Sequence, residues 1–271
     1  MSSGDPGLFG PDSSVWRIDR EVLILAGGTC ALLMQLAHPS VAAGVEQHSD
    51  FRGDPFGRLR RTLSATYAVA FGTRRRAQQA IDRMNAIHGV VRGRVPDSGQ
   101  AYAARDPELL LWVHATLIDT ALRVYHRYVA PLSEGEQEAY HRESRLIATS
   151  LGVPEDRMPH RLADLRAWMA AQLSDGPVRV TPVARRLAPA VLHPTRFPPR
   201  AVWNAGHLIS FSVMPPALRE GYGIAWGPGH ESVMRGVAAT TRRLLPLVPP
   251  VLRHVPAARA AERRAGSWSR T

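Results

Sequence analysis

Cationic and hydroxyl side chains gather in one short stretch of the sequence. Arg58, Arg61 and Thr62 stand at positions i, i+3 and i+4, so they share one face if the stretch is helical. Ala65 and Val69 fall on the same face, which is therefore partly cationic and partly apolar. A guanidinium fork pairs with carboxylates, and an apolar surface suits a hydrocarbon body. The pattern indicates a site for a large flat ligand that carries carboxylates.

The next predicted helix, from about Arg74 to Val95, offers a histidine to such a ligand. His88 lies on its apolar face, together with Ile81, Met84 and Val91. Imidazole is the commonest protein ligand of haem iron, and the propionates of haem are carboxylates. Haem therefore fits both features, with His88 as the metal ligand. The alternative is a core histidine bonded to a backbone carbonyl.

Four further side chains are candidates for catalytic roles. His114 lies on the apolar stripe of a helix that begins at Asp106-Pro107, where it could line a pocket, donate a hydrogen bond or itself ligate the iron. His38 precedes Pro39, so it either ends a helix or lies on the distal side of the ligand. Glu46 and His48 could supply a general base or a distal hydrogen bond, or occupy a solvated turn.

Several common kinds of site have no support in the sequence. The chain has no HExxH or CxxC motif, and it has no GxSxG, GxGxxG or Walker sequence. The single Cys30 excludes an intrachain disulfide and fits a reducing compartment. No lysine occurs, so Schiff-base and P-loop chemistry are excluded.

The charge is strongly basic. All 34 basic residues are arginine, against 23 acidic residues, which gives a net charge of +11. Such a charge favours an anionic partner, so a helical module for nucleic acid or an anionic membrane is one alternative function. No recognition-helix turn or heptad accompanies the charge, and we expect no nucleic-acid partner.

The patterning predicts an all-α fold, a single multi-helix domain over residues 1–271, and the haem interpretation places a buried haem pocket between its helices. Strand alternation is nearly absent. Residues 1–12 are expected to form a loose arm, and residues 257–271 a frayed tail. Proline, glycine and capping residues predict helices that start near 13, 55, 74, 107 and 134, and further helices at about 160–174, 180–190, 199–212 and 230–245.

The chain is expected to be cytoplasmic. Its first residues lack a basic region followed by an apolar core, so no signal peptide is predicted. The most apolar stretch, Val22 to Val45, contains Gly27-Gly28 and is interrupted at His38-Pro39. These breaks favour a buried helix pair over a transmembrane segment.

The sequence resembles the rubber-oxygenase and MpaB-type oxygenase family. The resemblance covers about residues 10–160 and is carried by four segments, GGTCALLMQLAHPSVAAGVEQHSDFRGDPFGRLRRT, RMNAIHGVVRG, DPELLLWVHATLIDTALRVY and YHRESRLIATSLGVP. Members of this family are all-helical, and many bind haem b. The resemblance therefore implies an all-α oxygenase with a haem b cofactor.

The resemblance also assigns roles to individual residues. It places the proximal iron ligand on His88 and the arginine and threonine near the haem on Arg58 and Thr62. Arg61 stands where the best-studied rubber oxygenases have a lysine, and an arginine does not readily lose its proton to ligate iron. A closed state capped by that side chain is therefore not expected. We expect Arg58, Arg61 and Arg92 to neutralise the propionates.

The predicted function is a haem b-dependent oxygenase that acts with O₂ on an apolar small molecule. An alkene in an isoprenoid or fatty chain is the expected substrate, because the resemblance implies attack on an electron-rich carbon. The chain is shorter than the rubber oxygenases and has no visible export signal, which disfavours polyisoprene. The alternative is a non-enzymatic haem or lipid carrier on the same fold.

Overall fold

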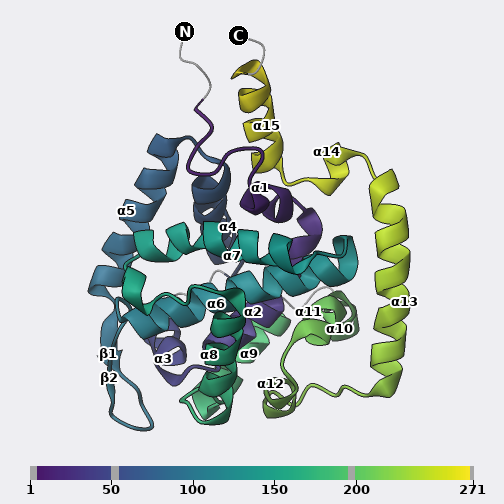
Figure 1. Ribbon diagram of the computed structural model, residues 1–271. Coiled ribbons are helices and arrows are strands. Elements are labelled where there is room, and N and C mark those ends of the chain that lie inside the picture. The colour runs from purple at the N-terminus through teal and green to yellow at the C-terminus, as the bar shows by residue number, and fades with distance from the viewer. Residues whose placement is uncertain (1–4, 50–54, 195–198, 269–271) are drawn as a thin grey trace.

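The computed structural model describes residues 5–49, 55–194 and 199–268 (Figure 1). Within these ranges, the side chains of Pro55, Phe56, Arg58, Ser267 and Trp268 also lie outside the described part. The described chain is mainly helical, as the sequence predicts, and its large core joins residues from Phe9 to Ala261.

The elements follow one another along the chain with short connections. The first half contains α1 (Ser14–Asp19), η1 (Val22–Gly27), α2 (Gly28–Leu36), α3 (Pro39–His48), α4 (Pro55–Phe71), α5 (Arg74–Val90), β1 (Arg92–Arg94), β2 (Ala101–Ala103), α6 (Pro107–Val124), η2 (Tyr125–Val129) and α7 (Glu134–Ser150). The second half contains η3 (Glu155–Arg157), α8 (Leu162–Ser174), α9 (Pro182–Leu192), α10 (Arg200–Gly206), α11 (Leu208–Val213), α12 (Pro216–Gly221), α13 (Pro228–Leu244), η4 (Leu245–Leu247), α14 (Pro250–Arg253) and α15 (Pro256–Trp268).

Helix α6 is the centre of the packing. It contacts α2, α7, α8 and α11 (Figure 1), and most of its side chains are buried. The indole of Trp112 donates a hydrogen bond to the carbonyl of Met34 at 3.1 Å, which ties α6 to α2. A helix that buries most of its side chains must be enclosed by others, and α2, α7, α8 and α11 enclose α6 for this reason.

Local capping signals set the helix ends. The Ser13 hydroxyl accepts from the Trp16 amide, and Ser133 forms a capping box with Glu136. Thr73 caps α5 directly after Gly72, and Gly152 follows α7 with a φ of 109° that an L side chain rarely adopts. These helix starts, and those at Pro55 and Pro107, confirm the sequence predictions.

The region after α5 differs from the prediction. The helix ends at Val90 rather than near Val95, and β1 and β2 form a short antiparallel hairpin in which Gly93 lies opposite Tyr102. A Cβ on Gly93 would lie 2.4 Å from the Gln47 Oε1 atom and 2.8 Å from the Tyr102 hydroxyl, so any larger residue would have to displace these side chains. The strands have three residues each, too few to produce a recognisable alternation.

Both ends of the described chain are packed rather than loose. The Asp5 carboxylate accepts from the amides of Gly7 and Arg74, and Phe9 is buried. The C-terminal segment forms α15, which packs on α4, and its Ala258 and Ala261 are fully buried. The structure thus packs residues that the sequence predicted as a loose arm and a frayed tail, and in α15 alanine allows close helix packing without large apolar side chains.

The apolar stretch near the N-terminus forms two helical segments with a sharp bend. In the described part of the chain, no single helix is both long and apolar enough to cross a bilayer. Val22–Leu36 and Pro39–His48 meet that test only when taken together, and they are bent by 102°. The break falls at His38-Pro39, as the sequence predicts, and Cys30, Leu33 and Met34 belong to the core.

Candidate functional site

Helices α4 and α5 form an antiparallel pair joined at Gly72-Thr73 (Figure 1), and this pair carries every predicted cofactor residue except Arg92, which lies on β1. Val69, Ala70 and Phe71 at the end of α4 are buried, whereas Arg61 and Thr62 are exposed. Leu59 exposes 45% of its surface. The N-terminal half of α4 thus presents an apolar and cationic surface that few side chains of the described chain cover. Arg58 also lies in this half, but its side chain falls outside the described residues.

His88 lies in the last turn of α5 and is half-buried. Its Nδ1 atom is buried and has no hydrogen-bond partner, which is unusual for a buried polar atom. Burial, and then the nearby Arg105 guanidinium, lower the pKa of His88 below its ordinary value. The imidazole is therefore kept neutral, which is the form that binds a metal.

Two hydrogen bonds fix the turn of α5 that carries His88. The Asn85 side-chain amide donates to the carbonyl of Ser150 at 3.0 Å, which ties α5 to the end of α7. Arg105 donates to the carbonyl of Asn85 at 3.0 Å. A Cβ on Gly89 would lie 3.3 Å from the Arg105 guanidinium, so this glycine makes room for the arginine beside His88. The predicted ligand thus lies on a rigid element.

A second buried imidazole lies on α6. His114 is 6% exposed, and its Nε2 atom is buried without a partner. Burial, and then the neighbouring His141, lower the pKa of His114 to about 3. His141 on α7 is fully buried; its Nε2 lies 3.0 Å from the carbonyl oxygen of Pro159, and its Nδ1 has no partner. Each member of this neutral pair therefore retains one unpaired ring nitrogen.

His38 lies at the bend between α2 and α3. Its side chain caps α3, because Nδ1 accepts from the Ser40 amide at 3.2 Å. Burial lowers the pKa of His38 to about 4, and the Asp106 carboxylate acts in the opposite direction. The histidine thus has the helix-boundary role that was one of the two sequence interpretations, and its distal role stays a prediction.

Glu46 and His48 do not converge with His38. The carboxylate of Glu46 pairs with Arg186 of α9 at 3.1 Å. His48 is exposed, and its Nε2 lies 3.0 Å from the backbone carbonyl oxygen of Arg92 on β1. The two side chains therefore have partners on different elements, and their predicted roles as a general base stay untested.

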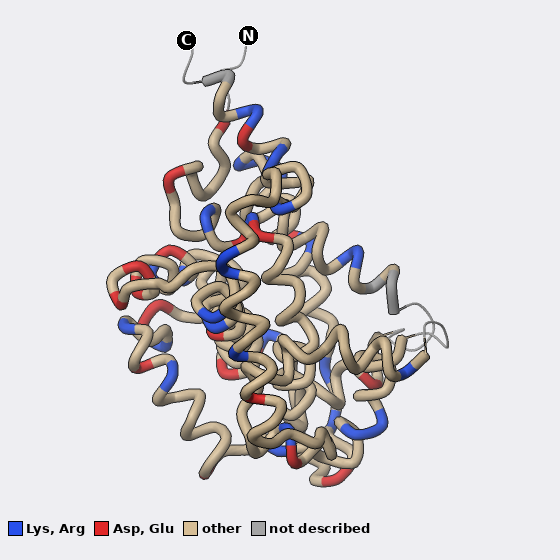
Figure 2. Tube along the Cα trace, turned by 90° about the vertical axis from the view of Figure 1, so that its right-hand side faces the viewer, with Lys and Arg blue, Asp and Glu red and all other residues tan. Residues whose placement is uncertain are grey.

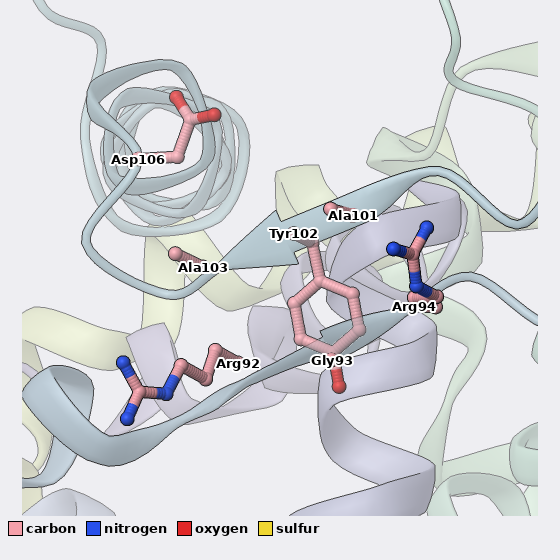
Figure 3. A pocket seen from close by; sticks show the side chains of 7 residues that line it. All are labelled: Arg92, Gly93, Arg94, Ala101, Tyr102, Ala103 and Asp106. Carbon is pink, nitrogen blue, oxygen red and sulfur yellow. The ribbon is translucent and has the colours of Figure 1, made fainter.

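The hairpin borders an open hollow of about 550 Å³ (Figure 3). Its lining includes Arg92, Arg94, Tyr102 and Asp106, and Figure 3 shows the arginine side chains extending from β1 at either end of the Tyr102 ring. Arg92 is exposed and lines this hollow. It lies two residues after the end of α5, the helix that carries His88. The predicted buried pocket between helices is a separate feature and stays a prediction.

The sequence interpretation missed two polar side chains next to the candidate ligands. Arg105 follows the hairpin, and no local pattern connects it with His88. His141 had a detectable signal, because it stands with Ser144 and Ala148 at helical spacing on the buried stripe of α7. That stripe faces the interior, so it predicts a second buried histidine.

The described residues fit haem in their chemistry. An iron porphyrin with two propionates needs a neutral imidazole with an unpaired nitrogen, polar side chains for the propionates and uncovered apolar surface. The described residues supply an imidazole of this kind, an arginine and a threonine, and exposed apolar side chains. Exposed Leu59 on α4 and Ile87 on α5, at 45% and 55%, supply apolar area that a bound ligand would cover.

Comparison with known proteins identifies the family. The family model described as "ER-bound oxygenase mpaB/B'/Rubber oxygenase, catalytic domain" matches residues 16–243. The chain belongs to this oxygenase family. The match extends from α1 to α13, so it includes every predicted site residue, and it confirms the family resemblance drawn from the sequence.

The chain is also similar to two mycobacterial proteins that carry no functional name. Uncharacterised proteins of Mycobacterium tuberculosis and Mycobacterium bovis are each 26% identical to it over 227 residues, which is 80% of this chain and 87% of the relative. No solved structure matches the chain. The oxygenase assignment therefore rests on the family match.

Proposed function

We propose that the chain is a haem b-dependent oxygenase that acts with O₂ on an apolar, unsaturated small molecule of isoprenoid or lipid type. Membership of the oxygenase family supports the reaction class. The observation that supports a haem cofactor is the state of His88: its buried Nδ1 atom lacks a hydrogen-bond partner, and its imidazole is kept neutral. The cytoplasmic location of the chain stays a prediction.

The residues of α4 and α5 would hold the cofactor between them. His88 would ligate the iron through its neutral ring. Arg61 would neutralise a propionate, and Thr62 would donate a hydrogen bond to one, since both lie exposed on the same helix. An arginine does not readily give up its proton to ligate iron, so Arg61 would not compete with His88 for it.

Haem, when bound, supplies an iron centre that activates O₂. The part of the chain is to hold the imidazole neutral and fixed, and to bury an apolar substrate away from water. Arg105 and Asn85 serve the first task, because they secure the last turns of α5. The exposed Leu59 and Ile87 provide apolar contacts for the second.

Absorption spectroscopy of protein expressed with a haem precursor tests the proposal. The wild type should show a Soret band at about one haem per chain, with a shift on CO addition that reports an open iron position. His88→Ala should lose this band, whereas His160→Ala, at an exposed histidine, should retain it. Loss in His114→Ala with retention in His88→Ala would move the ligand to α6.

A wild-type protein that takes up no hemin would overturn the haem proposal. Oxygen uptake with a panel of isoprenoid alkenes and unsaturated fatty acids then separates oxygenase from carrier. Substrate-dependent uptake by the haem protein, absent in His88→Ala, is expected of an oxygenase. Rapid haem exchange without O₂ consumption would support the carrier instead.

A further inference from the structure

The segment from α13 to α14 runs along one edge of the molecule (Figure 1), and it carries a series of exposed apolar side chains. Its six members expose between 37% and 78% of their surface: Val233, Val237, Leu244, Leu247, Val251 and Leu252. We call them the α13–α14 ridge. Isolated exposed leucines and valines are common, but a contiguous series on one segment marks an interaction surface.

The ridge is distinct from the face by which α13 is held in the fold. Met234 and Ala238 are buried and face η2 and α11, against which the helix packs. Val233 and Val237 stand one position earlier and form a separate stripe beside the buried one. The helix thus has more apolar surface than its own core uses.

The ridge continues beyond α13 into η4 and α14, where prolines restrict the backbone. Pro246 lies in η4, and Pro249 and Pro250 start α14, so the backbone here is stiff and leaves Leu247 and Leu252 78% and 70% exposed. Helix α14 lies against η1, where Val22 and Leu25 are also exposed, at 39% and 42%. The apolar surface therefore extends over two segments distant in sequence.

The segment that carries the ridge is basic between Glu231 and Glu262. The 232–261 stretch contains five arginines and no aspartate or glutamate. Arg253 donates a hydrogen bond to Glu21. Arg235, Arg242 and Arg243 are exposed on α13. This helix lies on the side of the molecule that faces the viewer in Figure 2. A matching partner must offer both apolar volume and negative charge.

A second copy of the chain matches this surface poorly. A symmetric dimer through the ridge would place two arginine-bearing surfaces against each other, and no acidic side chain of residues 232–261 would compensate them. A nucleic acid would satisfy the arginines but leave the exposed leucines and valines in water. An anionic phospholipid bilayer satisfies both, through acyl chains and headgroups.

We propose that the α13–α14 ridge docks the protein peripherally on anionic phospholipid bilayers. The apolar side chains enter the headgroup and acyl boundary, while the arginines approach the anionic headgroups. The ridge lies on the side of the molecule away from α5 (Figure 1). Docking is therefore independent of the cofactor proposal and can be measured with or without haem.

Vesicle flotation tests this directly. Full-length protein should float with vesicles of equal parts phosphatidylcholine and phosphatidylglycerol, and much less with phosphatidylcholine alone. Leu247→Ser/Leu252→Ser should weaken binding roughly tenfold or more, because two largely exposed leucines no longer enter the bilayer. Leu117→Ser/Leu146→Ser, at exposed leucines of α6 and α7, is the matched control and should bind as the wild type does.

The charge requirement has its own variant pair. Arg242→Gln/Arg243→Gln should reduce binding to the anionic vesicles about tenfold, while Arg75→Gln/Arg76→Gln, at exposed arginines of α5, should not. Circular dichroism of each variant confirms that the fold is kept. The proposal would be overturned by equal binding to both vesicle types or by unchanged binding of the ridge variants. It would also be overturned if the protein did not bind vesicles and instead formed a dimer that the leucine substitutions disrupt.

Discussion

The Arg253 guanidinium donates a hydrogen bond from Nε to the Glu21 carboxylate at 2.8 Å, which joins residues near the two ends of the chain. Glu21 is 1% exposed and precedes η1, while Arg253 ends α14. The bridge between the backbones of Glu21 and His254 lies beside it. The C-terminal helices are thus fixed to the core through a buried charge.

Removal of the arginine should therefore destabilise the whole fold. Arg253→Leu leaves the Glu21 carboxylate buried without its cation, and we expect a loss of about 3 kcal/mol in the free energy of unfolding. Urea denaturation followed by circular dichroism measures it. Glu21→Gln/Arg253→Leu should recover part of the loss, because no unpaired charge remains. A single variant as stable as the wild type would show that the pair contributes nothing.

The helix boundaries were predictable from the sequence because their signals are local. A proline at the first position of α4 or α6, or Ser133 with Glu136, acts on neighbouring backbone atoms and needs no knowledge of the fold. The β-hairpin was missed because its strands have three residues each, too few for an alternating pattern. Packing of α15 was missed because alanines contribute little to a hydrophobic pattern.

The candidate site was predictable only in part, for a related reason. His88 and His114 could be placed on apolar faces from periodicity. Their electrostatic neighbours come from other elements: Arg105 follows β2, and His141 lies on α7. Which groups meet across elements depends on tertiary packing, and no spacing in a single sequence records it.

The buried His114 should make the protein less stable in mild acid. Its pKa of about 3 in the folded state lies below the ordinary value of 6.5, so the unfolded chain binds the proton more readily between these pH values. Stability is full above pH 6.5 and falls as the pH decreases towards 3. From pH 7 to pH 5, His114 alone should cost about 2 kcal/mol.

A variant isolates this contribution from those of other titrating groups. The free energy of unfolding of His114→Leu, measured by urea denaturation at pH 7 and pH 5, should decrease less between the two values than that of the wild type. His160→Leu, at an exposed histidine, should behave as the wild type does. Equal pH dependence in all three proteins would contradict the assignment.

Arg105 should contribute, after burial, to the lowered pKa of His88. The guanidinium favours the neutral imidazole, so Arg105→Gln should raise the pKa of His88. Proton NMR titration of the haem-free protein follows the His88 ring signal directly, and the same spectra provide the other histidines as internal controls. If haem is bound as proposed, the variant should also lose it at a higher pH than the wild type. An unchanged or lower pKa would rule out this role for Arg105.

Two adjacent glycines should respond in opposite ways to the same substitution. A Cβ on Gly27 would lie 2.7 Å from the Thr120 Cγ2 atom and 2.8 Å from the Val124 Cγ2 atom, whereas a Cβ on Gly28 meets nothing within 4 Å. Gly27 lets η1 approach α6, and Gly28 is the first residue of α2.

Gly27→Ala should therefore destabilise the protein by about 2 kcal/mol, since the well-packed centre must shift. Gly28→Ala should be neutral or stabilise it by up to about 1 kcal/mol, because alanine favours helix. Thermal and urea unfolding of the pair measure the difference, and equal effects of the two substitutions would mean that η1 does not pack on α6 as closely as described.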